Sequence, residues 1–149
     1  MLVIACVLIF ALWSSRQTSL RRSARQSDRI HAACVEARTI VDLTTPPDSN
    51  ATLDTSTLSA VFTRLRHLDE RLRRMAADEP CSRVVEAIED VRRVGSLLAA
   101  ALEAERSLRL RAPKNATDRR EQSVERIAAC SAELDSASED LRWLVETVD

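Results

Sequence analysis

Few side chains in this sequence are of the types that bind metal, and three of them could lie near one another. His31 and Cys34 are three residues apart, so on a helix they share one face, and His67 follows in the next predicted helix. At about 1.5 Å of rise per residue, both histidines lie roughly 15 Å from one end of the predicted helices. Imidazole and thiolate are ligands for zinc and copper. Two histidines often lie at the same height along a bundle by chance, however. We therefore interpret them as ordinary residues of the packed helix faces (the seams) or of the surface, and we expect no metal and no other cofactor.

Two of the four cysteines could form a disulfide. The same estimate of helix rise places Cys34 about 20 Å and Cys130 about 24 Å from that end, on helices predicted to be neighbours. Cys81 lies at the end itself and Cys6 in the apolar N-terminal stretch. We therefore predict a Cys34–Cys130 bridge, which would close a loop of about 97 residues and be worth up to about 4.7 kcal/mol. The alternative is four reduced cysteines, because free cysteine is among the most buried residue types.

The rest of the sequence offers no catalytic motif. We find no Ser, His and Asp arrangement, no haem-attachment motif, no zinc-protease helix and no inward set of carboxylates with histidines. A single Gly in 149 residues excludes Gly-rich phosphate loops and leaves too few turns for a β-sandwich or barrel. With 22 basic and 23 acidic residues and 3% aromatics, the chain has no basic field for nucleic acid. We expect an all-α, non-enzymatic domain that binds neither nucleic acid nor a small-molecule substrate.

The first residues have the composition of a membrane anchor. The stretch from Leu2 to Trp13 is unbroken and apolar. As a helix, residues 1–15 would span about 22 Å, less than the roughly 30 Å of a bilayer core. A cleaved signal peptide is the rival interpretation, but there is no basic stretch before the apolar run and no small-residue cleavage site after it. We predict an uncleaved single-pass anchor with Trp13 at the membrane interface. Because the span is short, it would be most stable when packed against other transmembrane helices.

The orientation of this anchor is contested within the sequence. Five arginines follow the apolar stretch, and nothing charged precedes it except the α-amine; they are Arg16, Arg21, Arg22, Arg25 and Arg29. By the positive-inside rule they place the domain in the cytoplasm. The predicted disulfide argues for the opposite side, because disulfides rarely persist in cytosol. We favour the extracytoplasmic, periplasmic side and keep the cytoplasmic one as the alternative.

Beyond the anchor, hydrophobic periodicity predicts four helices, at residues 16–43, 56–77, 80–111 and 118–148. Short connections between them favour an up-down-up-down bundle. Pro80 is expected in the first turn of the third helix, and Asp118 with Glu121 resembles a capping box opening the fourth. The seam of the second helix alternates steps of three and four without a miss, and consists of Leu58, Val61, Leu65, Leu68, Leu72 and Met75. The expected seam of the fourth is Val124, Ile127, Ser131, Leu134, Ser138, Leu141, Val145 and Val148.

Charged pairs mark the faces that we expect in water. Opposite charges recur four residues apart, where each pair stabilises a helix by only a few tenths of a kcal/mol; they include Asp69 with Arg73, Glu70 with Arg74 and Glu105 with Arg109.

Trp143 is the aromatic residue that suggests a contact with a partner. It lies off the expected seam of the last helix and close to the membrane end. An indole has an apolar body and a polar tip, which suits a lateral contact with a partner or an interfacial position beside Trp13. The remaining possibility is that it folds back over the edge of the bundle. We prefer a contact with another protein.

Two acceptor sequons for N-glycosylation begin at Asn50 and Asn115, both in predicted loops. A secreted eukaryotic or viral chain would be glycosylated there. Lys114 is the only lysine beside many arginines, as is typical of GC-rich bacterial coding. We interpret the two asparagines as loop and cap residues.

A short N-terminal anchor, an Arg- and Ala-rich four-helix domain and scattered cysteines together resemble the prokaryotic respiratory supercomplex association factor of actinobacteria. The likeness covers the whole chain and is architectural, so no functional residue is carried over. It implies a periplasm-facing accessory protein without a redox centre, attached to a complex of a cytochrome bc-type complex with a terminal oxidase. We expect such a structural or assembly subunit of an electron-transport complex. The alternative is a membrane-tethered adaptor or sensor whose bundle binds soluble partners.

Overall fold

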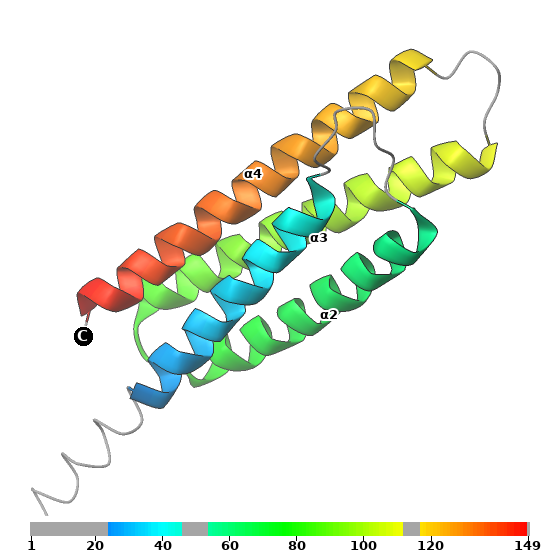
Figure 1. Cartoon of the computed structure of the whole chain (residues 1–149). Coiled ribbons are helices and arrows are strands. Elements are labelled where there is room, and N and C mark those ends of the chain that lie inside the picture. Colours follow the sequence, from blue (N-terminus) through cyan, green and yellow to red (C-terminus); the bar gives the residue numbers. More distant parts are fainter. Residues whose placement is uncertain (1–23, 46–53, 112–116, 149) are drawn as a thin grey trace, which may run out of the picture.

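The computed structural model describes residues 24–45, 54–111 and 117–148, and this part of the chain is helical without any strand. The first helix covers residues 24–44, followed by α2 (Thr55–Asp78), α3 (Ser82–Arg111) and α4 (Thr117–Val148). Figure 1 shows the four helices side by side, each antiparallel to the one before it. The predicted all-α fold and four-helix bundle are thus confirmed.

The described helices do not include the expected membrane anchor. No helix within the described ranges is both long and apolar enough to cross a bilayer. Residues 1–15, and Trp13 among them, lie outside the described residues.

Polar contacts between helices establish the order of the bundle. The Thr44 and Ser131 hydroxyls are 2.8 Å apart and join the first helix to α4. Arg92 Nε of α3 lies 2.9 Å from Asp69 Oδ1 of α2. Glu36 of the first helix forms ion pairs with arginines of α2, and α3 packs closely on α4. Each helix therefore has its sequence neighbours beside it, and α4 closes the bundle against the first helix, in up-down-up-down order.

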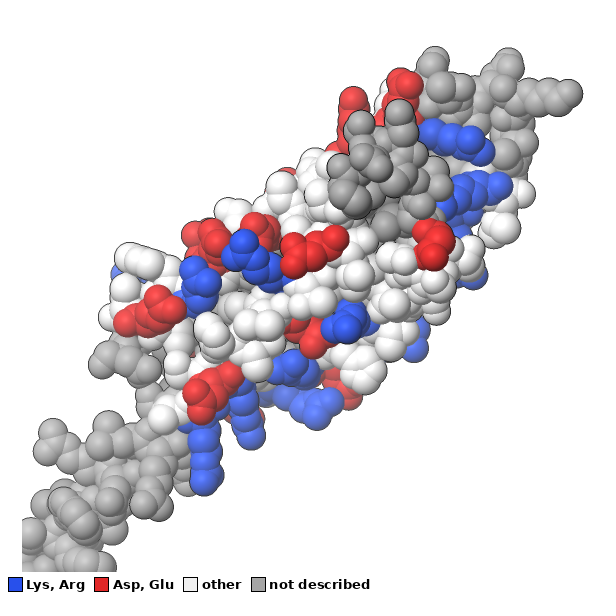
Figure 2. Space-filling view, in the orientation of Figure 1, with Lys and Arg blue, Asp and Glu red and all other residues white. Residues whose placement is uncertain are grey.

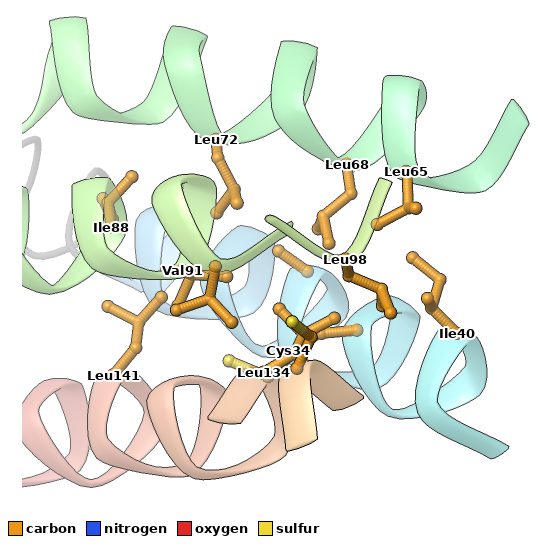
Figure 3. Packing of buried hydrophobic residues seen from close by; sticks show 14 of the residues in the cluster. Cys34, Ile40, Leu65, Leu68, Leu72, Ile88, Val91, Leu98, Leu134 and Leu141 are labelled. Carbon is orange, nitrogen blue, oxygen red and sulfur yellow. The ribbon is translucent and has the colours of Figure 1, made fainter. Parts of the chain in front are cut away.

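The core follows the seams that periodicity predicts. All six seam residues expected for α2 are buried, and a matching stripe of α3 is buried as well: Val84, Ile88, Val91, Leu98 and Leu102. In Figure 3, Leu68 and Leu72 of α2 point toward Val91 and Leu98 of α3 in the centre of the bundle. A 3.6-residue helix with an apolar side chain every three or four residues buries one stripe and leaves the rest in water.

Val124 is the seam residue that the structure corrects. It is 46% exposed, although the seam positions of α4 from Ile127 to Val145 are buried or half-buried. The cause is a difference in helix length, because α3 and α4 have 30 and 32 residues and α2 has 24. The end of the α3–α4 hairpin therefore extends beyond α2, as Figure 1 shows, and side chains there have fewer neighbours to bury them.

Helix starts agree with the sequence only in part. Asp54 caps α2, since its carboxylate accepts a hydrogen bond from the Thr57 amide at 2.6 Å. Hydrogen bonds from the side chain and the amide of Thr57, together with one from Ser56 Oγ, lower the pKa of Asp54. Pro80 lies before α3, which begins at Ser82, and Asp118 lies inside α4, which begins at Thr117. The expected positions of Pro80 in a first turn and of Asp118 as a cap are therefore wrong by one or two residues.

A pair of adjacent leucines tests the core. Leu98 is fully buried and Leu97 is 40% exposed. We expect Leu98→Ala to lower the free energy of unfolding by about 3 kcal/mol through lost burial and a cavity, and Leu97→Ala by less than about 1 kcal/mol. Both changes have the same helix-propensity effect, so denaturant unfolding of the two variants isolates burial. Equal losses would contradict this core.

Candidate functional site

The structure does not contain the expected disulfide. Cys34, Cys81 and Cys130 are free, the first and last of them buried. The register between the first helix and α4 explains why. Thr44 faces Ser131, the neighbour of Cys130, whereas Cys34 faces Ser138. Ten residues of helix separate Cys34 from Thr44, so the two cysteines lie about 15 Å apart along the bundle, beyond the roughly 6 Å that a disulfide spans between Cα atoms.

Cys34 is a packed and protonated thiol. Its Sγ lies 3.3 Å from the backbone oxygen of Ser138 and donates a hydrogen bond to it. Burial raises the pKa of this thiol to about 11. Since a thiol reacts as the thiolate, Cys34 is inert at neutral pH. A small cavity of about 40 Å³ lies beside it, between the first helix and α4.

The two histidines face different parts of the molecule. His31 borders the small cavity beside Cys34, whereas His67 lines a groove between α2 and α3. Both side chains are exposed. Within the described ranges, no three His, Cys, Asp or Glu side chains are grouped so that they could hold a metal ion. The structure therefore does not bring His31, Cys34 and His67 together, because an equal height along the bundle did not place the two histidines on one face.

Glu105 is a buried carboxylate that the sequence did not reveal. Its i,i+4 pairing with Arg109 indicated a solvated face, yet only 3% of Glu105 is exposed. Arg109 Nε donates to Glu105 Oε1 at 2.9 Å, while Oε2 has no hydrogen-bond partner in the described part of the chain. The pairs of Asp69 with Arg73 and Glu70 with Arg74 form as expected, on the surface. Spacing alone thus predicts a pair but not the face on which it lies.

Trp143 lies off the core, as expected. It is 64% exposed and does not fold back over the edge of the bundle. The core residues of α4 nearest to it are Ser138 and Leu141, which lie on the opposite side of the helix at 100° per residue. Figure 1 shows that the C-terminal end of α4, which carries Trp143, lies at the same end of the bundle as residue 24.

A groove of about 880 Å³ lies between α2 and α3, and we call it the α2/α3 groove. Its apolar lining includes Leu58, Phe62, Leu65, Ala99 and Leu110. Four arginines and two carboxylates also line it: Arg66, Arg92, Arg106, Arg109, Asp69 and Glu103. Sequence reasoning missed this groove, because a groove depends on the spacing of two helices and not on the pattern of either.

Gly95, the only glycine of the chain, lies in the α2/α3 groove in the middle of α3. A Cβ added there would meet Leu65 Cδ2 at 3.8 Å, an ordinary van der Waals contact. Packing within this chain therefore does not require a glycine.

Comparison with models of protein families, with curated proteins and with solved structures finds no match for this chain.

Gly95→Ala tests whether the groove floor has this room. We expect the substitution to raise the free energy of unfolding by about 0.8 kcal/mol, because alanine is the better helix former and nothing clashes. Thermal unfolding monitored by circular dichroism measures the change. Ser96→Ala, on the exposed neighbouring position, controls for propensity alone and should have a smaller effect. A destabilised Gly95→Ala protein would show that the helices pack more tightly than described.

Proposed function

We propose that this chain is a non-catalytic accessory subunit of a bacterial membrane complex that aids its assembly or stability. Residues 1–15 would anchor it, and Trp143 would contact a neighbouring subunit. One observation carries the proposal: a large indole is exposed on the outward face of α4, at the end of the bundle where the first helix begins. Tryptophan is among the residue types enriched at the energetic centres of protein interfaces.

The position of Trp143 suits such a contact. If residues 1–15 cross a membrane, the end of the bundle near residue 24 is the end nearest to it. A side chain there can contact the part of a membrane protein that emerges from the bilayer. The architectural resemblance to the respiratory supercomplex association factor suggests a cytochrome bc-type complex and a terminal oxidase as partners, with the bundle on the periplasmic side.

Copurification tests this role of Trp143. We expect the tagged wild-type chain, extracted from its native membranes in mild detergent, to bring down other membrane subunits in stoichiometric amounts. Trp143→Ala should reduce their yield at least tenfold, because truncating a central interface tryptophan costs about 2 kcal/mol or more. Val35→Ala is the matched control, since Val35 is an exposed apolar residue on the first helix.

Quantitative mass spectrometry of the purified material gives the result. A wild-type chain that purifies alone, or a Trp143→Ala chain that keeps its neighbours in full yield, would contradict the proposal.

A membrane-tethered adaptor or sensor on the cytoplasmic side is the second candidate. It is favoured by the arginines that follow the apolar stretch and by the three free thiols, since the expected disulfide was the residue-level reason for the periplasmic side. Its charged helices would then face soluble partners.

Cys81 can report which side of the membrane carries the bundle. It is half-buried, whereas Cys34 and Cys130 are buried, and Cys6→Ser removes the thiol of the apolar stretch. With the accessory subunit facing the periplasm, a membrane-impermeant maleimide should modify the Cys6→Ser chain in intact cells. Adding Cys81→Ser should abolish the modification. Labelling only after lysis would place the bundle in the cytoplasm and favour the adaptor.

A further inference from the structure

We propose that the α2/α3 groove is a docking site for an acidic amphipathic helix of a partner protein. This rests on the proposed function in one respect, that the chain acts by binding other proteins. It concerns a different surface from Trp143, because the groove lies between α2 and α3 whereas Trp143 lies on α4.

The shape of the groove fits a helix. Its lining runs from Thr55 to Leu72 on α2, which is about 26 Å at the rise of a helix, and from Val91 to Leu110 on α3, about 28 Å. That length accommodates roughly five turns of an occupant helix. An amphipathic helix recognised in this way places its apolar face into a groove through side chains three and four residues apart. Phe62 is half-buried and Leu110 is 80% exposed, so both offer apolar surface to an occupant.

Gly95 leaves the α3 side of the groove without a side chain. A glycine in a helix interior costs about 1 kcal/mol relative to alanine, and here the space around it shows no internal reason for that cost. Ser96 and Ala99, which also line the groove, are small as well. Small side chains on one helix allow a second helix to approach closely, and among the described residues none fills the groove at this part of the α3 surface.

The charge of the surrounding helices selects the partner. Together α2 and α3 carry eleven arginines and eight carboxylates, whereas α4 carries four arginines and eight carboxylates. Figure 2 shows several arginines along the lower edge of the molecule, where α2 lies. An acidic helix is therefore attracted to the α2–α3 side, and a basic one is not.

Individual arginines at the groove can meet such a partner. Arg66 is exposed and forms no ion pair with a carboxylate of the described residues. Among the described residues Arg106 forms an ion pair only with Glu103, at 3.7 Å, and both side chains are more than half exposed. Asp69, in contrast, is neutralised by Arg92 at 2.9 Å. Carboxylates flanking the apolar face of a bound helix would pair with Arg66 and Arg106.

Two model peptides test the proposal with the purified full-length chain in mild detergent. Both are 18-residue amphipathic helices with one leucine stripe; the stripe is flanked by glutamates in one and by lysines in the other. Fluorescence anisotropy of labelled peptides measures binding at low and at physiological salt. We expect the glutamate peptide to bind at least tenfold more tightly, and this preference to weaken with salt.

Variants locate the binding on the molecule. Ser96→Trp fills the groove from an exposed position of α3 and should weaken binding of the glutamate peptide at least tenfold. Ser136→Trp, on an exposed position of α4, is the matched control and should bind as the wild type does. The double change Arg66→Glu with Arg106→Glu keeps the groove open and should reverse the preference in favour of the lysine peptide. Circular dichroism and thermal unfolding establish that each variant is folded.

Three outcomes would overturn the proposal. They are equal binding of the two peptides, binding that Ser96→Trp leaves unchanged, and a groove occupied by a second copy of the chain. The last would appear in light scattering as a dimer or larger species that Ser96→Trp converts to monomer. None of these results depends on Trp143, so a failure of the groove proposal leaves the accessory-subunit proposal standing. Conversely, a Trp143→Ala chain that keeps its neighbours in full yield would contradict the role of Trp143 and leave the groove proposal standing.

Discussion

Each helix of this bundle is held chiefly by the apolar stripe that it turns toward the other three, because the described residues contain no disulfide and no metal cluster. The ion pairs are mostly exposed and so stabilise little. Arg29 with Asp78, for example, joins two helices at 3.9 Å with both side chains more than 60% exposed. Burial of the seams therefore carries most of the stability. Residues on the outer faces therefore contribute little to the stability of the bundle. An exposed apolar side chain or an unpaired charge on those faces is then better explained by binding than by folding.

The helices and their buried faces could be predicted because both follow from local pattern. The α2 seam from Leu58 to Met75 steps by three and four, and a helix has no other way to bury those side chains together. The axial register between helices could not be predicted in the same way. Estimated from helix lengths alone, it placed Cys34 beside Cys130, whereas the Thr44–Ser131 contact sets these cysteines about ten residues out of step. Register depends on how side chains of two helices interdigitate and on the connecting loops, and neither is visible in one helix.

Residues near the candidate site show the same contrast between local pattern, which the sequence reveals, and the arrangement of helices, which it does not. Spacing placed Glu105 and Arg109 in a pair, and the pair forms, but the carboxylate lies on the core side of α3. His31 and His67 were expected at the same height along the bundle, yet His31 borders the small cavity beside Cys34 and His67 lines the α2/α3 groove. One feature of the sequence could have indicated the α2/α3 groove: a single glycine, Gly95, in the interior of a long predicted helix. A residue that weakens its own helix is evidence of close approach by something else when the chain's own packing leaves the space empty.

The two outward features of the bundle imply different kinds of contact. Trp143 is one apolar anchor on α4, the helix with the most carboxylates, and the groove is a long apolar surface on the arginine-rich side. Neither contact has to be strong alone. If residues 1–15 hold the chain in the same membrane as its partners, each contact forms at a raised effective concentration, and two weak contacts on one partner complex reinforce each other. A small bundle can then stabilise a much larger assembly by bridging two of its surfaces, without any chemistry of its own.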